Sequence, residues 1–135
     1  MKRWIVAILS VLVALAVGWW VLSGTLHVPI DPADVKEVRL WGNSIGHQGR
    51  PATTEEKAQI IRWFNQGANP RDNSALAGTT PDAGIQFAFQ NGSTLRILRS
   101  GTDFEVQDHR AMKARYYWLR QPEIRKLLDE LAKNK

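Results

Sequence analysis

The residues best suited to covalent chemistry lie in the run Gly42-Asn43-Ser44-Ile45-Gly46, which fits the pattern G-x-S-x-G. In hydrolases with this pattern, the serine sits on a sharp turn between a strand and a helix, where its oxygen is exposed above the sheet. Here a loop sequence, His47-Gln48-Gly49-Arg50-Pro51, follows the run instead of a helix. Ser44, an aspartate and His109 stand in a workable chain order, but the roughly 108 residues from Val28 onward are few for a hydrolase sheet. A glycine-rich turn with a solvated serine is expected, and a small hydrolase using Ser44 is an alternative.

Metal, cofactor and thiol chemistry find little support. His27, His47 and His109, with Asp108, do not have the spacing of a compact metal site, so three surface histidines are expected. The chain has no cysteine, which excludes disulfides, cysteine-based zinc sites and lipid attachment to cysteine. Its glycine-rich loops lack both common nucleotide-binding patterns. The sequence therefore predicts a protein that is not an enzyme and that uses no metal and no cofactor.

A basic and aromatic stretch is the best candidate for a binding surface. Residues 109–135 contain eight Lys or Arg against three Asp or Glu, with three aromatic residues in the middle. These three cannot all point inward from one strand, so at least one must face solvent or a partner. A solvated strand and helix is the simpler interpretation. The predicted interaction residues are Arg110, Arg115, Tyr116, Tyr117, Trp118 and Arg120.

The N-terminal segment predicts where this surface lies. Residues 4–23 contain no charge, no proline and one glycine, and a helix of this length spans about 30 Å, the thickness of a bilayer core. Lys2 and Arg3 precede the segment, and tryptophans stand near both ends. We expect an uncleaved signal-anchor helix (1–23) in the cell membrane, a tether (24–34) and an extracytoplasmic domain (35–135). Cleavage near Ala14-Leu15-Ala16, which would release a secreted protein, is the alternative.

The first half of the domain is expected to contain one strand and one helix. Val35–Trp41 has strand character, and Gly42–Pro51 reads as a loop. Thr53 and Glu56 form a capping box, which predicts a helix that stops at Gly67. Residues 67–84 predict a long, mobile loop that takes part in binding. The inner face of the helix is predicted to consist of Ala58, Ile60, Ile61 and Phe64, with Trp63 at its edge.

The second half predicts a meander followed by a strand and a helix. Residues 85–89, 95–97 and 104–106 alternate between apolar and polar side chains, and Asn91-Gly92 predicts a type I′ turn. A strand at 116–119 precedes a helix that begins at Pro122. The fold class is therefore α+β, an antiparallel β-meander packed by two helices. The predicted core consists of Phe87, Phe89, Leu95, Ile97, Phe104, Ile61, Phe64, Leu127 and Leu128.

Four runs follow one another in residues 35–132: TTEEKAQIIRWFNQGANPRDNS, IQFAFQNGSTLRIL, FEVQD and RYYWLRQPEIRKLLDEL. In this order they resemble a family of small uncharacterised extracytoplasmic domains found in Gram-positive bacterial lipoproteins and membrane-tethered proteins. The chain departs from the family in lacking a lipid-attachment cysteine and in the region His109–Ala114. The resemblance implies a bacterial, membrane-tethered domain, and because the family has no established catalytic residues, none is carried over to this chain.

These observations predict a membrane-anchored, non-enzymatic extracytoplasmic module for interaction or sensing. Its expected partners are membrane lipid and a protein at the outer membrane face, and contact with anionic lipid headgroups or cell-wall polyanions is expected for the basic stretch. Nucleic acid is not an expected partner outside the cytoplasm. An immunity-type protein, which intercepts a toxin or an enzyme at that face, is the alternative within the binding class.

Overall fold

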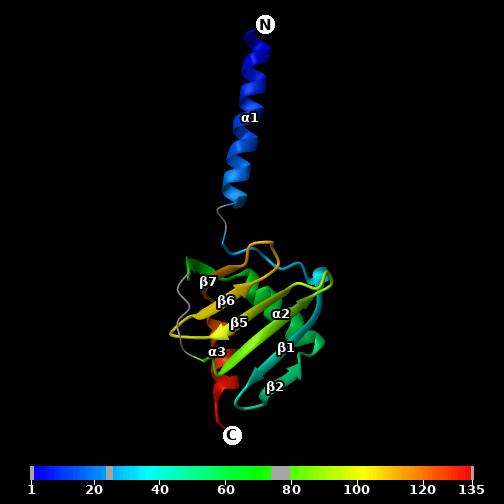
Figure 1. Ribbon diagram of the computed structural model, residues 1–135, viewed down its shortest axis with the longest axis vertical. Helices are drawn as coiled ribbons and strands as arrows, with labels where there is room; N and C mark the ends of the chain where they lie inside the picture. The colour runs from blue at the N-terminus through cyan, green and yellow to red at the C-terminus, as the bar shows by residue number, and fades with distance from the viewer. Residues whose placement is uncertain (1, 24–25, 74–79, 135) are drawn as a thin grey trace.

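The chain folds as an N-terminal helix followed by one α+β domain (Figure 1), which confirms the predicted fold class. This computed structural model describes residues 2–23, 26–73 and 80–134. The domain contains one seven-stranded antiparallel sheet, in the order β2-β1-β4-β5-β6-β7-β3. The elements are α1 (Lys2–Ser23), a 3-10 turn (Pro32–Asp34), β1 (Val35–Gly42), β2 (Gly46–Pro51), α2 (Thr54–Asn65), β3 (Ala68–Asp72), β4 (Ala83–Phe89), β5 (Thr94–Arg99), β6 (Phe104–Asp108), β7 (Arg115–Arg120) and α3 (Pro122–Ala132).

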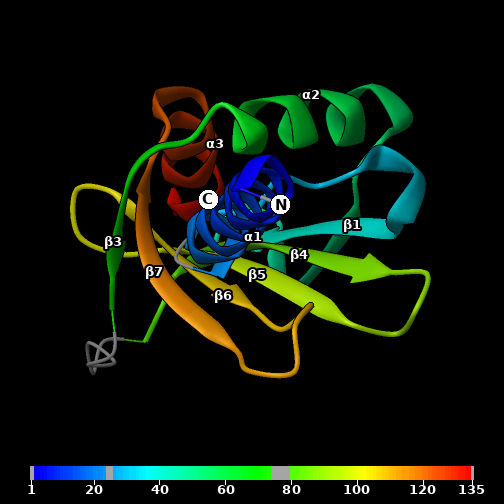
Figure 2. The same ribbon diagram turned by 90° about the horizontal axis from the view of Figure 1, so that it is seen from above.

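The sheet curves around the two helices of the domain, so that α2 and α3 cover its inner face (Figure 2). Apolar side chains on this face align across the strands, because the registers pair them directly. One such row contains Leu40, Ile85, Ile97, Val106 and Tyr117, each 0% exposed. The predicted core is confirmed, except that Leu127 is only partly buried at its margin.

Helix α2 begins as its sequence predicts. The Thr53 hydroxyl accepts a hydrogen bond from the Glu56 N–H at 3.1 Å, and the Glu56 carboxylate accepts one from the Thr53 N–H at 3.0 Å. The Arg50 guanidinium, which donates to Glu56, lowers the pKa of this carboxyl to about 2. Ile60, Ile61 and Phe64 are buried as predicted, whereas Ala58 is exposed and its assignment to the inner face is wrong.

Two predicted loops contain strands, and both of these strands lie at the edges of the sheet. Gly42–Pro51 was expected to be a loop, but its second half forms β2. Residues 67–84 were also expected to be a loop, but they contain β3 and the start of β4, and residues 74–79 lie outside the described part. Neither β2 nor β3 has a buried side chain, so neither shows the apolar alternation that predicts a strand.

The hairpin between β4 and β5 is confirmed, but its turn differs from the predicted type I′. A type I′ turn needs two residues with positive φ, and here Gly92 has φ +88° while Asn91 has a negative φ. The Gly92 N–H donates to the Phe89 carbonyl, and the Phe89 N–H donates to the Ser93 carbonyl, each at 3.0 Å. The loop therefore has three residues, Gln90-Asn91-Gly92, with the glycine in the left-handed position.

Helix α1 carries apolar side chains that the described part of the domain leaves uncovered. Nine of its large apolar residues between Trp4 and Leu15 are more than half exposed. Among the residues that the structure describes, no helix combines the length and apolar character needed to cross a membrane. The membrane span therefore stays a prediction.

Candidate functional site

The predicted interaction residues begin with two arginines that face inward. The Asp108 side chain is 0% exposed and accepts hydrogen bonds from the Arg110 Nε at 3.0 Å and from the Arg115 guanidinium at 3.0 Å. Burial alone would raise the pKa of Asp108, but the hydrogen bonds from Arg110 and the two nearby positive charges outweigh it and lower this pKa. Both guanidiniums are therefore committed to an internal carboxylate.

Arg110 also fastens the segment that follows α1. Its guanidinium donates to the Val28 carbonyl at 2.7 Å and to the Pro29 carbonyl at 2.9 Å. The Asn65 side chain accepts from the Ile30 N–H at 2.7 Å and donates to the Ile30 carbonyl at 2.9 Å. Ile30 is 2% exposed and belongs to the core. The residues assigned to a tether are thus docked onto the domain from Leu26 onward.

His27 completes this attachment and is not the surface residue that the sequence predicted. Its Nδ1 lies 3.0 Å from the hydroxyl of the buried Tyr117, and its ring packs edge-on against Phe64. Burial lowers the pKa of His27, and Arg110 and Arg115 act in the same direction. Its Nε2 is buried without a hydrogen-bond partner among the described residues.

The remaining predicted residues divide between the two faces of the sheet. Tyr117 belongs to the core, whereas its neighbours Tyr116 and Trp118 are half-buried on the outer face, as strand alternation requires. Arg120 is largely exposed and donates to Asp103 at 3.3 Å. The predicted group is therefore not one surface, although at least one aromatic residue faces outward as expected.

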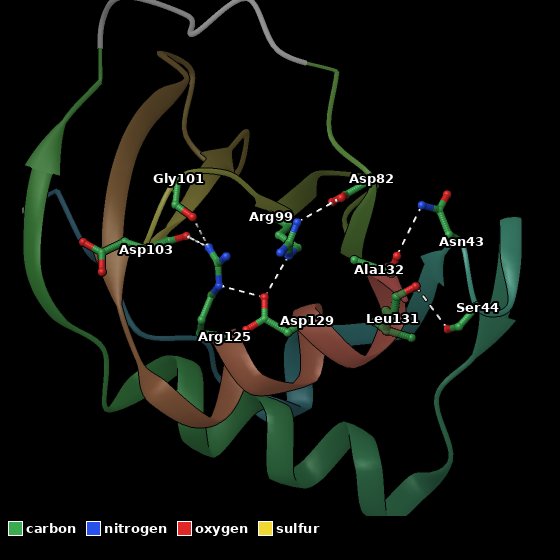
Figure 3. A network of polar contacts seen from close by, with 10 residues as sticks. All are labelled: Asn43, Ser44, Asp82, Arg99, Gly101, Asp103, Arg125, Asp129, Leu131 and Ala132. Atoms are coloured by element: carbon green, nitrogen blue, oxygen red, sulfur yellow. Dashed lines mark hydrogen bonds and ion pairs between the residues drawn. The ribbon is translucent and has the colours of Figure 1, made fainter. Parts of the chain in front are cut away.

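Ser44 holds the end of α3. Its hydroxyl and its N–H both donate to the Leu131 carbonyl, at 3.1 Å and 3.0 Å (Figure 3). Asn43 donates to the next carbonyl, that of Ala132, at 3.3 Å. These bonds satisfy carbonyls that the last turn of a helix leaves unpaired. No hydrogen bond joins Ser44 to a histidine in the described part of the chain.

The same figure shows how the middle of α3 is attached to the sheet. Asp129 accepts from Arg99 at 2.8 Å and from Arg125 at 3.0 Å, and Arg99 also donates to Asp82 at 2.9 Å (Figure 3). Arg125 reaches the Gly101 and Asp103 carbonyls, both at 2.6 Å. These contacts hold α3 against the sheet, and they occupy the charges of Arg99 and Arg125.

The outer face of the sheet carries a different set of side chains, which sequence reasoning missed. The registers place one polar residue from each of five adjacent strands directly opposite the next. We call this set the outer row: Arg39, Gln86, Arg96, Gln107 and Tyr116. In the sequence, these residues are the polar positions that alternate with apolar positions along the strands. The sequence alone does not show that they lie side by side; only the strand registers do.

A groove of about 570 Å³ lies over the first four residues of the outer row. Trp41 and His47 form one side of it, with their ring centroids 6.1 Å apart. The indole lies directly over Gly84, where an added Cβ would come within 2.6 Å of the ring. Glycine at this position therefore allows Trp41 to lie flat on the sheet beside the outer row.

The histidines do not gather into a metal site in the described part of the chain. His27 contacts Tyr117, His47 packs beside Trp41, and His109 packs edge-on against Tyr116. Within that part, no group of three or more His, Asp or Glu residues could hold a metal ion. The described residues thus offer a groove over the outer row and ion pairs that support the fold.

Comparison of the chain with protein-family models, curated proteins and solved structures finds no match. The resemblance to tethered extracytoplasmic domains therefore stays a prediction.

Proposed function

We propose that this protein is a membrane-anchored, non-enzymatic binding module whose domain lies outside the cytoplasm. The observation that carries this proposal is the uncovered apolar surface of α1. Trp4 is 78% exposed and Leu15 is 65% exposed, and the residues between them form an uncharged run. An uncharged apolar helix with this much exposed surface favours a bilayer as its environment.

The attachment of residues 26–30 supports the same arrangement. Because Arg110 and Asn65 hold this segment, few residues separate the end of α1 from the body of the domain. The domain would therefore stay close to the membrane surface. Lys2 and Arg3 before the apolar run favour an N-terminus inside and a domain outside.

Protease treatment of intact spheroplasts tests the topology. We expect added protease to digest the domain, while a cytoplasmic marker protein in the same sample stays intact. Protection of the domain in intact spheroplasts, with digestion after lysis, would overturn the proposed orientation.

Alkaline carbonate extraction of the membranes tests the anchor. We expect the full-length chain to stay in the membrane pellet. Release of a shortened chain that begins after residue 16 would show cleavage, and release of the full-length chain would show that α1 does not span the bilayer.

A further inference from the structure

We propose that the groove over the outer row binds an acidic saccharide, a chain of sugar units that carry carboxylates. This inference rests on the proposed function, because it names the ligand of an extracytoplasmic binding module. It assigns the binding to the outer face of the sheet instead of the basic stretch around Arg110 and Arg115.

The charge of the groove favours an anion. Arg39 and Arg96 both line it, and the described residues that line it include no carboxylate. Arg96 is exposed and makes no ion pair within the described part of the chain. Arg39 pairs with Glu37 at 3.3 Å, with both side chains about half exposed, so this pair can open at low cost. Guanidinium groups bind carboxylates through two parallel hydrogen bonds.

The two amide side chains favour a ligand with hydroxyl groups. Gln86 lies between Arg39 and Arg96 in the outer row, and Gln107 lies on the other side of Arg96. Each amide offers both a donor and an acceptor, as a sugar hydroxyl also requires. A row that alternates Arg and Gln therefore matches a ligand in which carboxylates alternate with hydroxyls.

The side of the groove at Trp41 supplies an apolar surface. The indole lies flat over Gly84, and Leu98 lies next to Gly84 on the neighbouring strand. A sugar ring has a face of C–H groups that can pack against such a surface, while its edge hydroxyls reach the polar row. A few directed polar groups beside an aromatic ring, in a volume of 300–1,000 Å³, are typical of a small-ligand site.

Besides Glu37, one nearby carboxylate could oppose this proposal: Glu105, whose Oε1 lies 3.5 Å from the Gln107 Nε2. Glu105 is opposite Leu98 in the next row of the outer face. It is only 6% exposed and does not line the groove. Within the described part of the chain it makes no ion pair with Arg96, so a ligand can still reach the Arg96 guanidinium.

Isothermal titration of the full chain in detergent tests the proposal, with an oligogalacturonate as the probe. We expect Arg96→Gln to weaken binding at least about tenfold, because it removes the charge-assisted contact. Arg62→Gln is the matched control: it removes an exposed arginine from α2, which covers the other face, and should change the affinity less than about twofold.

Gly84→Ala provides a second variant that leaves every lining side chain present. The new methyl group must displace the Trp41 ring, so we expect weaker binding with an unchanged far-ultraviolet circular dichroism spectrum. Wild-type affinity in both Gly84→Ala and Arg96→Gln would overturn the assignment of the groove.

Three further probes test the ligand class. Binding of the methyl-esterified oligogalacturonate as tight as that of the acid form would overturn the role of charge. Equal or tighter binding of polyglutamate, or of vesicles rich in phosphatidylglycerol, would overturn the saccharide assignment. Failure of all probes would overturn the inference but leave the membrane topology, which the spheroplast experiment decides separately.

Discussion

Replacement of Asp108 tests the main ionic attachment inside the domain. This carboxylate is 0% exposed and accepts four hydrogen bonds, three from Arg110 and one from Arg115, at 2.9–3.0 Å. Loss of one partner from a buried ion pair costs about 3–5 kcal/mol, because the other charge stays buried and uncompensated. We expect Asp108→Ala to reduce the free energy of unfolding by about 4 kcal/mol, because both arginines are less than one quarter exposed.

Glu37→Ala is the matched control, since it breaks a carboxylate–arginine pair that is half exposed and should cost about 0.5 kcal/mol or less. The measurement is urea unfolding of the full chain in detergent at pH 7, followed by near-ultraviolet circular dichroism. The double variant Asp108→Ala/Arg115→Met should lose less unfolding free energy than the two single variants lose together. In the double variant neither member of the Asp108–Arg115 pair stays buried without its partner. A loss below about 1 kcal/mol for Asp108→Ala, or strict additivity, would refute this reasoning.

Three further predictions use the same unfolding measurement. Phe87→Ala, which empties a fully buried position, should cost about 3–5 kcal/mol, and a loss below about 1 kcal/mol would contradict its place in the core. Thr53→Ala should cost about 1 kcal/mol through loss of the capping box, whereas Thr54→Ala should cost much less. The pKa of His27 is lowered in the fold, so on acidification the unfolded chain takes up a proton on this histidine at a higher pH than the folded chain does. The free energy of unfolding should therefore keep its full value above about pH 6.5 and should fall as the pH is lowered below that value. His27→Gln should remove this part of the pH dependence and His109→Gln should retain it; the same slope in both variants would exclude His27 as its source.

The central part of the fold could be predicted because its local signals agree with its packing. In β4 and β5 the apolar residues alternate along each strand, and the pattern alone placed Phe87 and Ile97 on the covered face. The capping box at Thr53 and the proline at position 122 fixed the starts of the two helices. These features depend on neighbours within a few residues of one another.

The edge strands could not be predicted in this way. Strand β2 follows β1 through a tight turn and needs only backbone hydrogen bonds to β1, so its side chains carry no pattern of burial. Strand β3 pairs with β7, which lies more than 40 residues further along the chain. A strand is recognised in a sequence by apolar residues that alternate because one face is buried. An edge strand with no buried side chain lacks this pattern.

The candidate site depends even more on pairing between distant segments. The sequence shows that Arg96 is polar between two apolar neighbours, but only the registers show that Gln86 and Gln107 flank it. In the same way, the basic stretch suggested a binding surface because its arginines, Arg110 and Arg115 among them, lie close in sequence to three aromatic residues. Asp108 pairs with Arg115 across the hairpin and neutralises it, a contact that composition cannot reveal.

Pairing with carboxylates therefore decides which positive charges are available to a partner. The formal charge of +5 counts every arginine equally. On the inner face, Arg99 and Arg115 are bound to Asp129 and Asp108, so a partner would have to displace an existing carboxylate to reach them. On the outer face, Arg96 lies between two neutral amides and makes no ion pair within the described part of the chain. An anionic ligand thus gains most where the local charge is uncompensated, which favours the groove over the stretch that is richest in basic residues.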